Sequence, residues 1–233
     1  MNPAPMIILG GALAWLTLFL FGLKKIRAGE FILGVFLFFL AIFAQGIIQQ
    51  VPFLWTGIKS NADLVSKGIK VIILASVWIG LTAALFQEGS KFFFVRRKSY
   101  SFAYSVGLGF GTAEVLMLAL NVTLVGMKVH VDVPLTIALL TMAERYLVLL
   151  FHVGTAILLA NGTWKVLLSV IGAHAVVDTL ASFYTLSKLI SQEMAFKVLI
   201  ISEGVLGIVT FVILLFAVPV ALKGKEDEEE VEW

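Results

Sequence analysis

The sequence predicts an all-α, polytopic transmembrane helical bundle with about seven spans. Sixty per cent of its 233 residues are hydrophobic, 14% are charged, and the mean hydropathy is +1.03. Soluble domains are about half apolar and a quarter charged, so this composition excludes a water-exposed globule. A spanning helix needs about 20 mostly apolar residues. Such stretches occur at 6–23, 31–50, 68–90, 102–126, 135–160, 166–190 and 196–222, in a single domain covering 1–222.

The first stretch, 6–23, is interpreted as a helix that stays in the membrane. No lysine or arginine precedes it and no small-residue cleavage site is clear, which disfavours a signal peptide. The stretch 31–50 follows a short basic connection. The longest connection, Gln49–Lys67, contains proline, glycine and asparagine and is predicted to be an interfacial loop.

The later stretches are separated by short connections. Trp55, Tyr100 and Trp164 stand at positions typical of an interfacial aromatic belt, next to predicted span ends. The stretch 196–222 is followed by the segment 223–233, which holds six of the chain's 15 acidic residues. This segment is predicted to be a solvated, disordered cytoplasmic tail, with a docking peptide as the alternative.

The distribution of lysine and arginine predicts the orientation. Odd-numbered connections and the C-terminus carry ten of these residues, even-numbered connections carry six, and Arg145 lies inside a span. By the positive-inside rule, the N-terminus is expected outside and the C-terminus in the cytoplasm of an integral cell-membrane protein. Membrane lipid is the expected surrounding. No basic stripe suits nucleic acid, and the absence of cysteine excludes disulfides and thiolate sites. The sequence leaves the oligomeric state open.

Ionisable residues within the predicted spans are the strongest functional signal. Each costs about 2.5–3.5 kcal/mol on insertion scales, so such residues are functional by default. They are Glu88, Glu114, Glu144, Arg145, His152, His174, Asp178 and Glu203. At about 1.5 Å per residue, His152 and His174 come out about 12 Å, and Glu114 and Asp178 about 18 Å, from the cytoplasmic end of their spans, whereas Glu88 is shallower. Four helices thus place carboxylates and imidazoles in the cytoplasmic half of the bilayer. Glu203 is expected to be structural, and His130 is expected at the surface.

Helical spacing indicates which of these side chains share a face. His174 and Asp178 are four residues apart, and Arg145 and His152 are seven apart. Lys91, three residues after Glu88, either neutralises that carboxylate or reaches toward the lipid phosphates. Each pair also has a purely structural interpretation, as a buried ion pair or a hydrogen-bonded core histidine.

Three glycines precede Glu114 at alternate positions, at Gly107, Gly109 and Gly111. Small residues at this spacing allow a neighbouring backbone to come close. They also allow the helix to loosen beside a polar cavity.

Two chemistries fit the predicted constellation. His152 and His174 with Glu114 match the ligands of a divalent metal, with zinc favoured, that leaves an open position for water. Alternatively, a carboxylate acts as general base on water, with histidine steering it and His174 with Asp178 holding the oxyanion. Either route predicts amide hydrolysis within or at the membrane.

Four segments, in order, resemble the motifs of the YhfC family. They are Phe86-Gln87-Glu88-Gly89-Ser90-Lys91-Phe92, Gly107-x-Gly-x-Gly-x-x-Glu114, Glu144-Arg145 followed by His152, and His174-x-x-x-Asp178. That family is grouped with PrsW and the CAAX-prenyl endopeptidases, in the Abi/CPBP superfamily, as intramembrane metalloproteases. The resemblance covers helices three to six, about 40% of the chain, and implies a CAAX-protease-like core around a cytoplasm-facing cavity.

The resemblance also implies roles for residues. Glu88, His152 and His174 would activate water or bind metal, Asp178 would take the place of the family's last polar residue, and Glu144 and Arg145 would support them. The sequence departs from the family at three points. Gln87 stands where the family usually has a glutamate, Phe110 stands near an expected histidine, and Asp178 replaces an asparagine.

The first prediction for function is therefore an intramembrane endopeptidase that acts on a peptide or transmembrane-helix substrate, with Glu88, Glu114, His152, His174 and Asp178 as its catalytic set. Two alternatives stay open. Intramembrane carboxylates and histidines also form the proton relays of ion-coupled transporters. Gln87 favours a non-catalytic relative that binds client helices without cutting them.

Overall fold

The computed structural model describes residues 2–128 and 133–231, with side chains to Lys223, and the regular structure of these residues is α-helical. Seven helices follow the predicted stretches in order: α1 (Ala4–Leu20), α2 (Ala28–Trp55), α4 (Ile69–Val95), α5 (Tyr100–Gly126), α6 (Leu135–Leu159), α7 (Trp164–Ser187) and α8 (Gln192–Val231). Six of them are long and apolar enough to cross a membrane, and α1, with 17 residues, is shorter. The predicted all-helical membrane bundle is confirmed. His130 lies outside the described residues.

The connection expected to be an interfacial loop is partly helical. Helix α2 continues through Pro52 to Trp55, and a short helix, α3 (Asn61–Ser66), follows. Helix α3 begins where the Ser60 side chain accepts a hydrogen bond from the Asp63 N–H at 3.1 Å, which satisfies one of the unpaired donors of a helix start. Local capping therefore creates an element that apolar length alone does not reveal.

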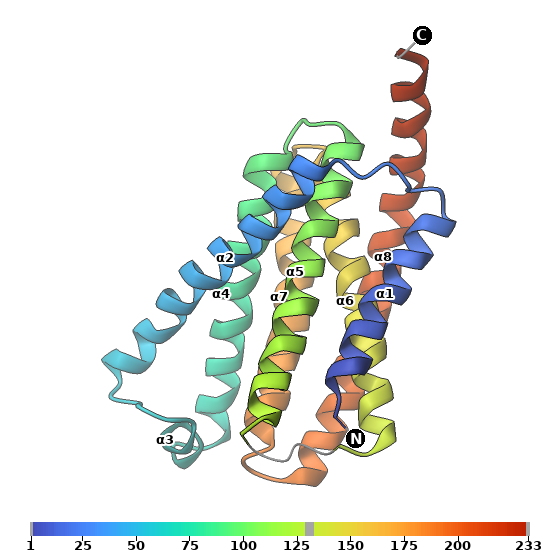
Figure 1. Ribbon diagram of the computed structural model, residues 1–233. Coiled ribbons are helices and arrows are strands. Elements are labelled where there is room, and N and C mark those ends of the chain that lie inside the picture. The colour runs from blue at the N-terminus through green and yellow to red at the C-terminus, as the bar shows by residue number, and fades with distance from the viewer. Residues whose placement is uncertain (1, 129–132, 232–233) are drawn as a thin grey trace.

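The acidic segment after residue 222 continues helix α8 as far as Val231, where the sequence predicts a disordered end. In Figure 1 this part of α8 rises past the other helices, next to the label of the C-terminus. Adding residues to an existing helix avoids the cost of nucleation, and glutamate and lysine are good helix formers.

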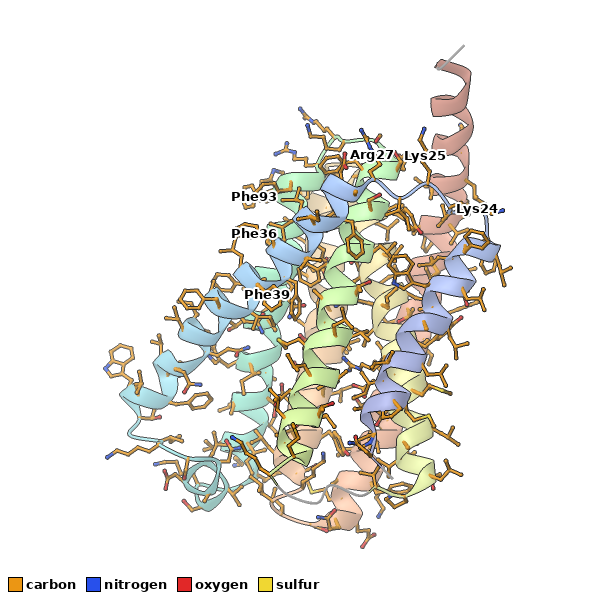
Figure 2. The ribbon with its side chains drawn as sticks, in the orientation of Figure 1. Lys24, Lys25, Arg27, Phe36, Phe39 and Phe93 are labelled. Carbon is orange, nitrogen blue, oxygen red and sulfur yellow. The ribbon has the colours of Figure 1, made fainter. Side chains whose placement is uncertain are left out.

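The helices pack side by side, with α4 against α7, α2 against α5, and α6 against α1, α5 and α8. Helix α3 and the N-terminus lie at one end of the bundle, which we call the α3 end (Figure 1). Lys24, Lys25 and Arg27 mark the opposite end, which we call the basic end (Figure 2). Each long helix therefore connects a basic end to an α3 end, as a polytopic bundle requires.

Large apolar side chains cover the outside of the bundle. Phe36, Phe39 and Phe93 are more than half exposed, and they point outward in Figure 2. Phe38 and Phe92 are buried in the core between α2, α4 and α5. Exposed apolar surface of this extent is typical of contact with lipid rather than with water.

Two glycines of α5 let it fit closely between its neighbours. A Cβ at Gly107 would lie 2.8 Å from the main-chain oxygen of His152 on α6. A Cβ at Gly109 would collide with the main-chain oxygen of Phe31 on α2. The predicted close backbone approach is confirmed, and it brings the α5 residue Glu114 within reach of His152.

Candidate functional site

The centre of the site is a lysine without any solvent exposure. The Lys91 ammonium on α4 donates to Glu88 Oε1 at 2.8 Å, to Thr155 Oγ1 at 2.8 Å and to His152 Nδ1 at 3.1 Å. An ammonium has three N–H donors, and here each has an acceptor. The contact with Glu88 neutralises that buried carboxylate, which is one of the two roles that the spacing of the two residues predicts.

The contact with Lys91 fixes the state of the His152 ring. Since Nδ1 accepts from the ammonium, the ring proton sits on Nε2, which donates to Glu114 Oε2 at 2.7 Å. Phe110 packs on the ring, with centroids 4.8 Å apart. Phe110 thus acts as a wall of the site.

The second histidine lies between two carboxylates. His174 Nδ1 on α7 is 2.6 Å from Glu88 Oε1, and Nε2 is 3.3 Å from Asp178 Oδ2. Both ring nitrogens face an anionic oxygen, which suits the protonated imidazole, in which both are donors. The shared helical face predicted for His174 and Asp178 is therefore a direct contact.

The opposite side of the site holds a guanidinium between two carboxylates. Arg145 on α6 donates to Glu114 Oε1 at 2.9 Å and also to Glu144. The eight charged or titratable groups thus form one series across α4 to α7: Asp178, His174, Glu88, Lys91, His152, Glu114, Arg145 and Glu144. Alternating charge offsets the desolvation of each group, because a buried charge is tolerated when it is paired and hydrogen-bonded.

One face of this series borders a small pocket of about 70 Å³. Carboxylates from four helices line it, together with both histidines and Arg145: Glu114, Glu144, Asp178 and Glu203. The side chains of Glu114 and Asp178 are 22% and 26% exposed, whereas those of Glu88 and Lys91 are wholly enclosed. The first two can therefore meet a ligand directly, and the enclosed pair holds the histidines from behind.

Aromatic side chains close the site toward the basic end. Phe92 packs on Trp164, with ring centroids 5.1 Å apart, and the Arg96 guanidinium lies over both rings. Lys91 lies one helical turn before Val95, the last residue of α4, which is a distance of about 6 Å along the helix axis. Phe151 packs against His174 with centroids 4.9 Å apart.

A second hollow, of about 420 Å³, adjoins the pocket at Asp178 and Ala181 and reaches Asn61 at the α3 end. The N-terminus lies at that same end (Figure 1). A cytoplasm-facing cavity and an outside N-terminus, both expected from the sequence, are therefore incompatible in this fold.

The donor atoms as arranged do not present an open set of metal ligands. Both nitrogens of His152 and of His174 already face charged partners, and Lys91 occupies the space between Glu88 and His152. Among the described residues, no three histidine, aspartate or glutamate side chains converge on a point that could hold a metal. Zinc bound by His152, His174 and Glu114 stays a prediction.

The structure adds residues that the predicted site lacked. Thr155 completes the shell of Lys91, one turn after His152. Gln87 lines the pocket and donates to Gln45 of α2 at 3.2 Å. Glu203, expected to be structural, also lines the pocket, and its Oε2 is buried without a hydrogen-bond partner among the described residues. The threonine and the glutamines are uncharged. The sequence prediction of the site depended on the energetic cost of ionisable groups in a membrane, so it could not identify these residues.

The chain was compared with protein-family models, with curated proteins and with solved structures, and none of them matches. The YhfC resemblance therefore stays a prediction.

Proposed function

We propose that this protein is an intramembrane hydrolase that cleaves peptide bonds of membrane-associated polypeptides. One observation carries the proposal: the series Asp178, His174 and Glu88 ends in a carboxylate on a pocket that also contains Arg145. An exposed carboxylate backed by a histidine is a general base held in one orientation. A positive charge on the same pocket can stabilise a developing oxyanion.

The reaction follows from these positions. The Asp178 carboxylate takes a proton from a water molecule, and the water oxygen adds to the carbonyl carbon of the scissile bond. Negative charge develops on the carbonyl oxygen and is stabilised by the cationic groups of the pocket, Arg145 and His174. When the C–N bond breaks, Asp178 returns its proton to the leaving nitrogen, so that the carboxylate is restored.

The remaining groups hold this arrangement in place. Glu88 fixes the ring of His174 through the 2.6 Å contact at Nδ1. Lys91 fixes Glu88 and His152 together, and His152 in turn orients Glu114. A site positioned by side chains that are themselves hydrogen-bonded needs little reorganisation during the reaction. Gln87, where the resembled family has glutamate, leaves the role of base to another carboxylate, and Asp178 is the one we assign.

Cleavage of a reporter polypeptide in proteoliposomes tests the proposal. Asp178→Asn, His174→Gln and Glu88→Gln should each lower kcat by about 10²–10⁴-fold, the usual contribution of general acid–base catalysis. Glu193→Gln is the matched control, because that carboxylate is 78% exposed and pairs only with Lys197 on its own helix. Parental cleavage by all three variants would reject the hydrolase.

The unbroken series of charged groups favours proton-coupled transport as the second candidate. Donors and acceptors alternate from Asp178 to Glu114 through two histidines, which is the composition of a membrane proton relay. A substrate-dependent proton flux into proteoliposomes, abolished by His152→Gln and accompanied by no cleavage, would support this candidate over the hydrolase.

A further inference from the structure

A groove with amide and hydroxyl side chains leads from the pocket to the α3 end. It is the hollow of about 420 Å³ that adjoins the pocket at Asp178 and Ala181. Four helices form its walls: Gln45 and Gln49 of α2, Asn61 of α3, Ile79 and Ala83 of α4, and Ser182, Thr185 and Leu186 of α7. Its volume is in the range of ligand-binding sites, about 300–1,000 Å³.

Helix α7 carries a continuous stripe from the site into this groove. The stripe begins at Asp178 and continues with Ala181, Ser182 and Thr185, which lie three, four and seven residues after it. All four residues therefore share one helical face. His174 precedes them by one turn on the same face. The side chains in this stripe are small or polar. Val176, on another face of α7, is apolar and 51% exposed, as expected for a lipid-facing surface. The stripe therefore gives the groove a wall that offers hydrogen bonds within the span.

Helices α2 and α4 supply the facing wall. Gln49 Nε2 donates to the main-chain oxygen of Ile79 at 3.0 Å, which ties α2 to α4 across the groove. Gln45 accepts from Gln87, and Gln87 lines the pocket. The amides of Gln45 and Gln87 thus link the groove to the pocket. On the basic end, by contrast, Phe92 and Trp164 close the bundle.

We propose that this groove binds an extended segment of the substrate polypeptide and guides it from the α3 end to Asp178. The identity of the bound segment as a substrate polypeptide rests on the proposed hydrolase function. The existence of a water-accessible route through the groove does not. An extended backbone has unpaired N–H and C=O groups, which are costly in hydrocarbon unless protein groups satisfy them. Glutamine, asparagine, serine and threonine side chains provide both donors and acceptors for such a segment.

Single-cysteine labelling tests the route without any assay of activity. The chain has no cysteine, so each introduced thiol is unique. In sealed vesicles, Ser182→Cys should react with a charged, membrane-impermeant methanethiosulfonate reagent from the side on which Lys59→Cys reacts. Lys59 is exposed next to α3 and reports that side. Val176→Cys is the matched control on the same helix and should not react. Failure of Ser182→Cys to react from that side would overturn the groove as a route.

Cleavage of the reporter polypeptide tests whether the groove binds the substrate. Ser182→Trp, which fills the groove away from the catalytic groups, should lower kcat/KM for the reporter about tenfold, equal to about 1.4 kcal/mol of lost binding. Val176→Trp should cleave at the parental rate. Parental kcat/KM in Ser182→Trp would overturn the groove as the docking site. If Ser182→Cys is labelled but the parent protein cleaves no reporter, both the hydrolase function and the binding of a substrate polypeptide in the groove are rejected. The water-accessible route through the groove is then still supported.

Discussion

At the scale of single residues, Lys91 organises the site. Its side chain is fully enclosed, and it touches a carboxylate, an imidazole and a hydroxyl from two helices. A buried charge of this kind is tolerated because every donor is satisfied, and removing its partners leaves uncompensated groups. The i, i+3 spacing to Glu88 identifies only one of these three contacts, since the other two come from α6.

Replacement of Lys91 by methionine is expected to destabilise the protein strongly. The change removes one of the two cations that contact the enclosed Glu88 carboxylate, the other being His174, and breaking a buried ion pair costs about 3–5 kcal/mol. Thermal unfolding in detergent, followed by loss of monodisperse protein, measures the effect. Lys197→Met is the control, because its pair with Glu193 is exposed and such pairs contribute about 0.3–0.5 kcal/mol. Equal melting temperatures for the two variants would contradict the central role of Lys91.

At the scale of elements, helix α5 depends on its glycines for its place between α2 and α6. Gly107 faces the His152 backbone, and Gly109 faces the Phe31 backbone. A main-chain atom cannot move aside as a flexible side chain can, so any added Cβ pushes whole helices apart. Because Glu114 follows on the same helix, a shift of α5 would also lengthen its contact with His152.

Gly109→Ala is therefore expected to be destabilising by about 1–3 kcal/mol, as for other overpacked positions. Thermal unfolding in detergent gives the comparison with the parent protein. Gly172→Ala on α7 serves as the control, because a Cβ there meets nothing within 4 Å, and alanine is about 1 kcal/mol better than glycine in a helix. The prediction fails if Gly109→Ala melts at or above the temperature of the parent.

At the scale of the whole molecule, the bundle has two unlike ends. The basic end carries Lys24, Lys25 and Arg27 (Figure 2), together with the Arg96–Lys98 turn between α4 and α5. The site is closed toward this end, and its groove opens toward the α3 end. The positive-inside rule assigns basic connections to the cytoplasm. We infer that the groove faces outward from the cell.

Opposite labelling of the two ends is the expected result for the whole molecule. Lys98→Cys should react with an impermeant thiol reagent only from the cytoplasmic side, and Lys59→Cys only from the outer side. Both positions are exposed and lie in connections at opposite ends of α4. Reaction of both from the same side would refute an odd number of crossings between them, and exchanged sides would reverse the inferred orientation.

The sequence by itself determined the all-helical membrane bundle, the order of its long helices and the residue types of the site. Apolar length fixes spanning helices because lipid leaves the backbone no other way to satisfy its polar groups. Helical spacing likewise fixes contacts within one helix, such as Glu88 with Lys91 and His174 with Asp178.

Only the tertiary structure decided which helices meet and from which end the site is reached. The contact of Lys91 with His152 joins residues 61 positions apart, and that of His174 with Glu88 joins residues 86 apart. Periodicity within one helix carries no information about its rotation relative to another. Contacts such as that of Gly109 with Phe31 set that rotation, and the rotation directs the polar faces of four helices to one pocket.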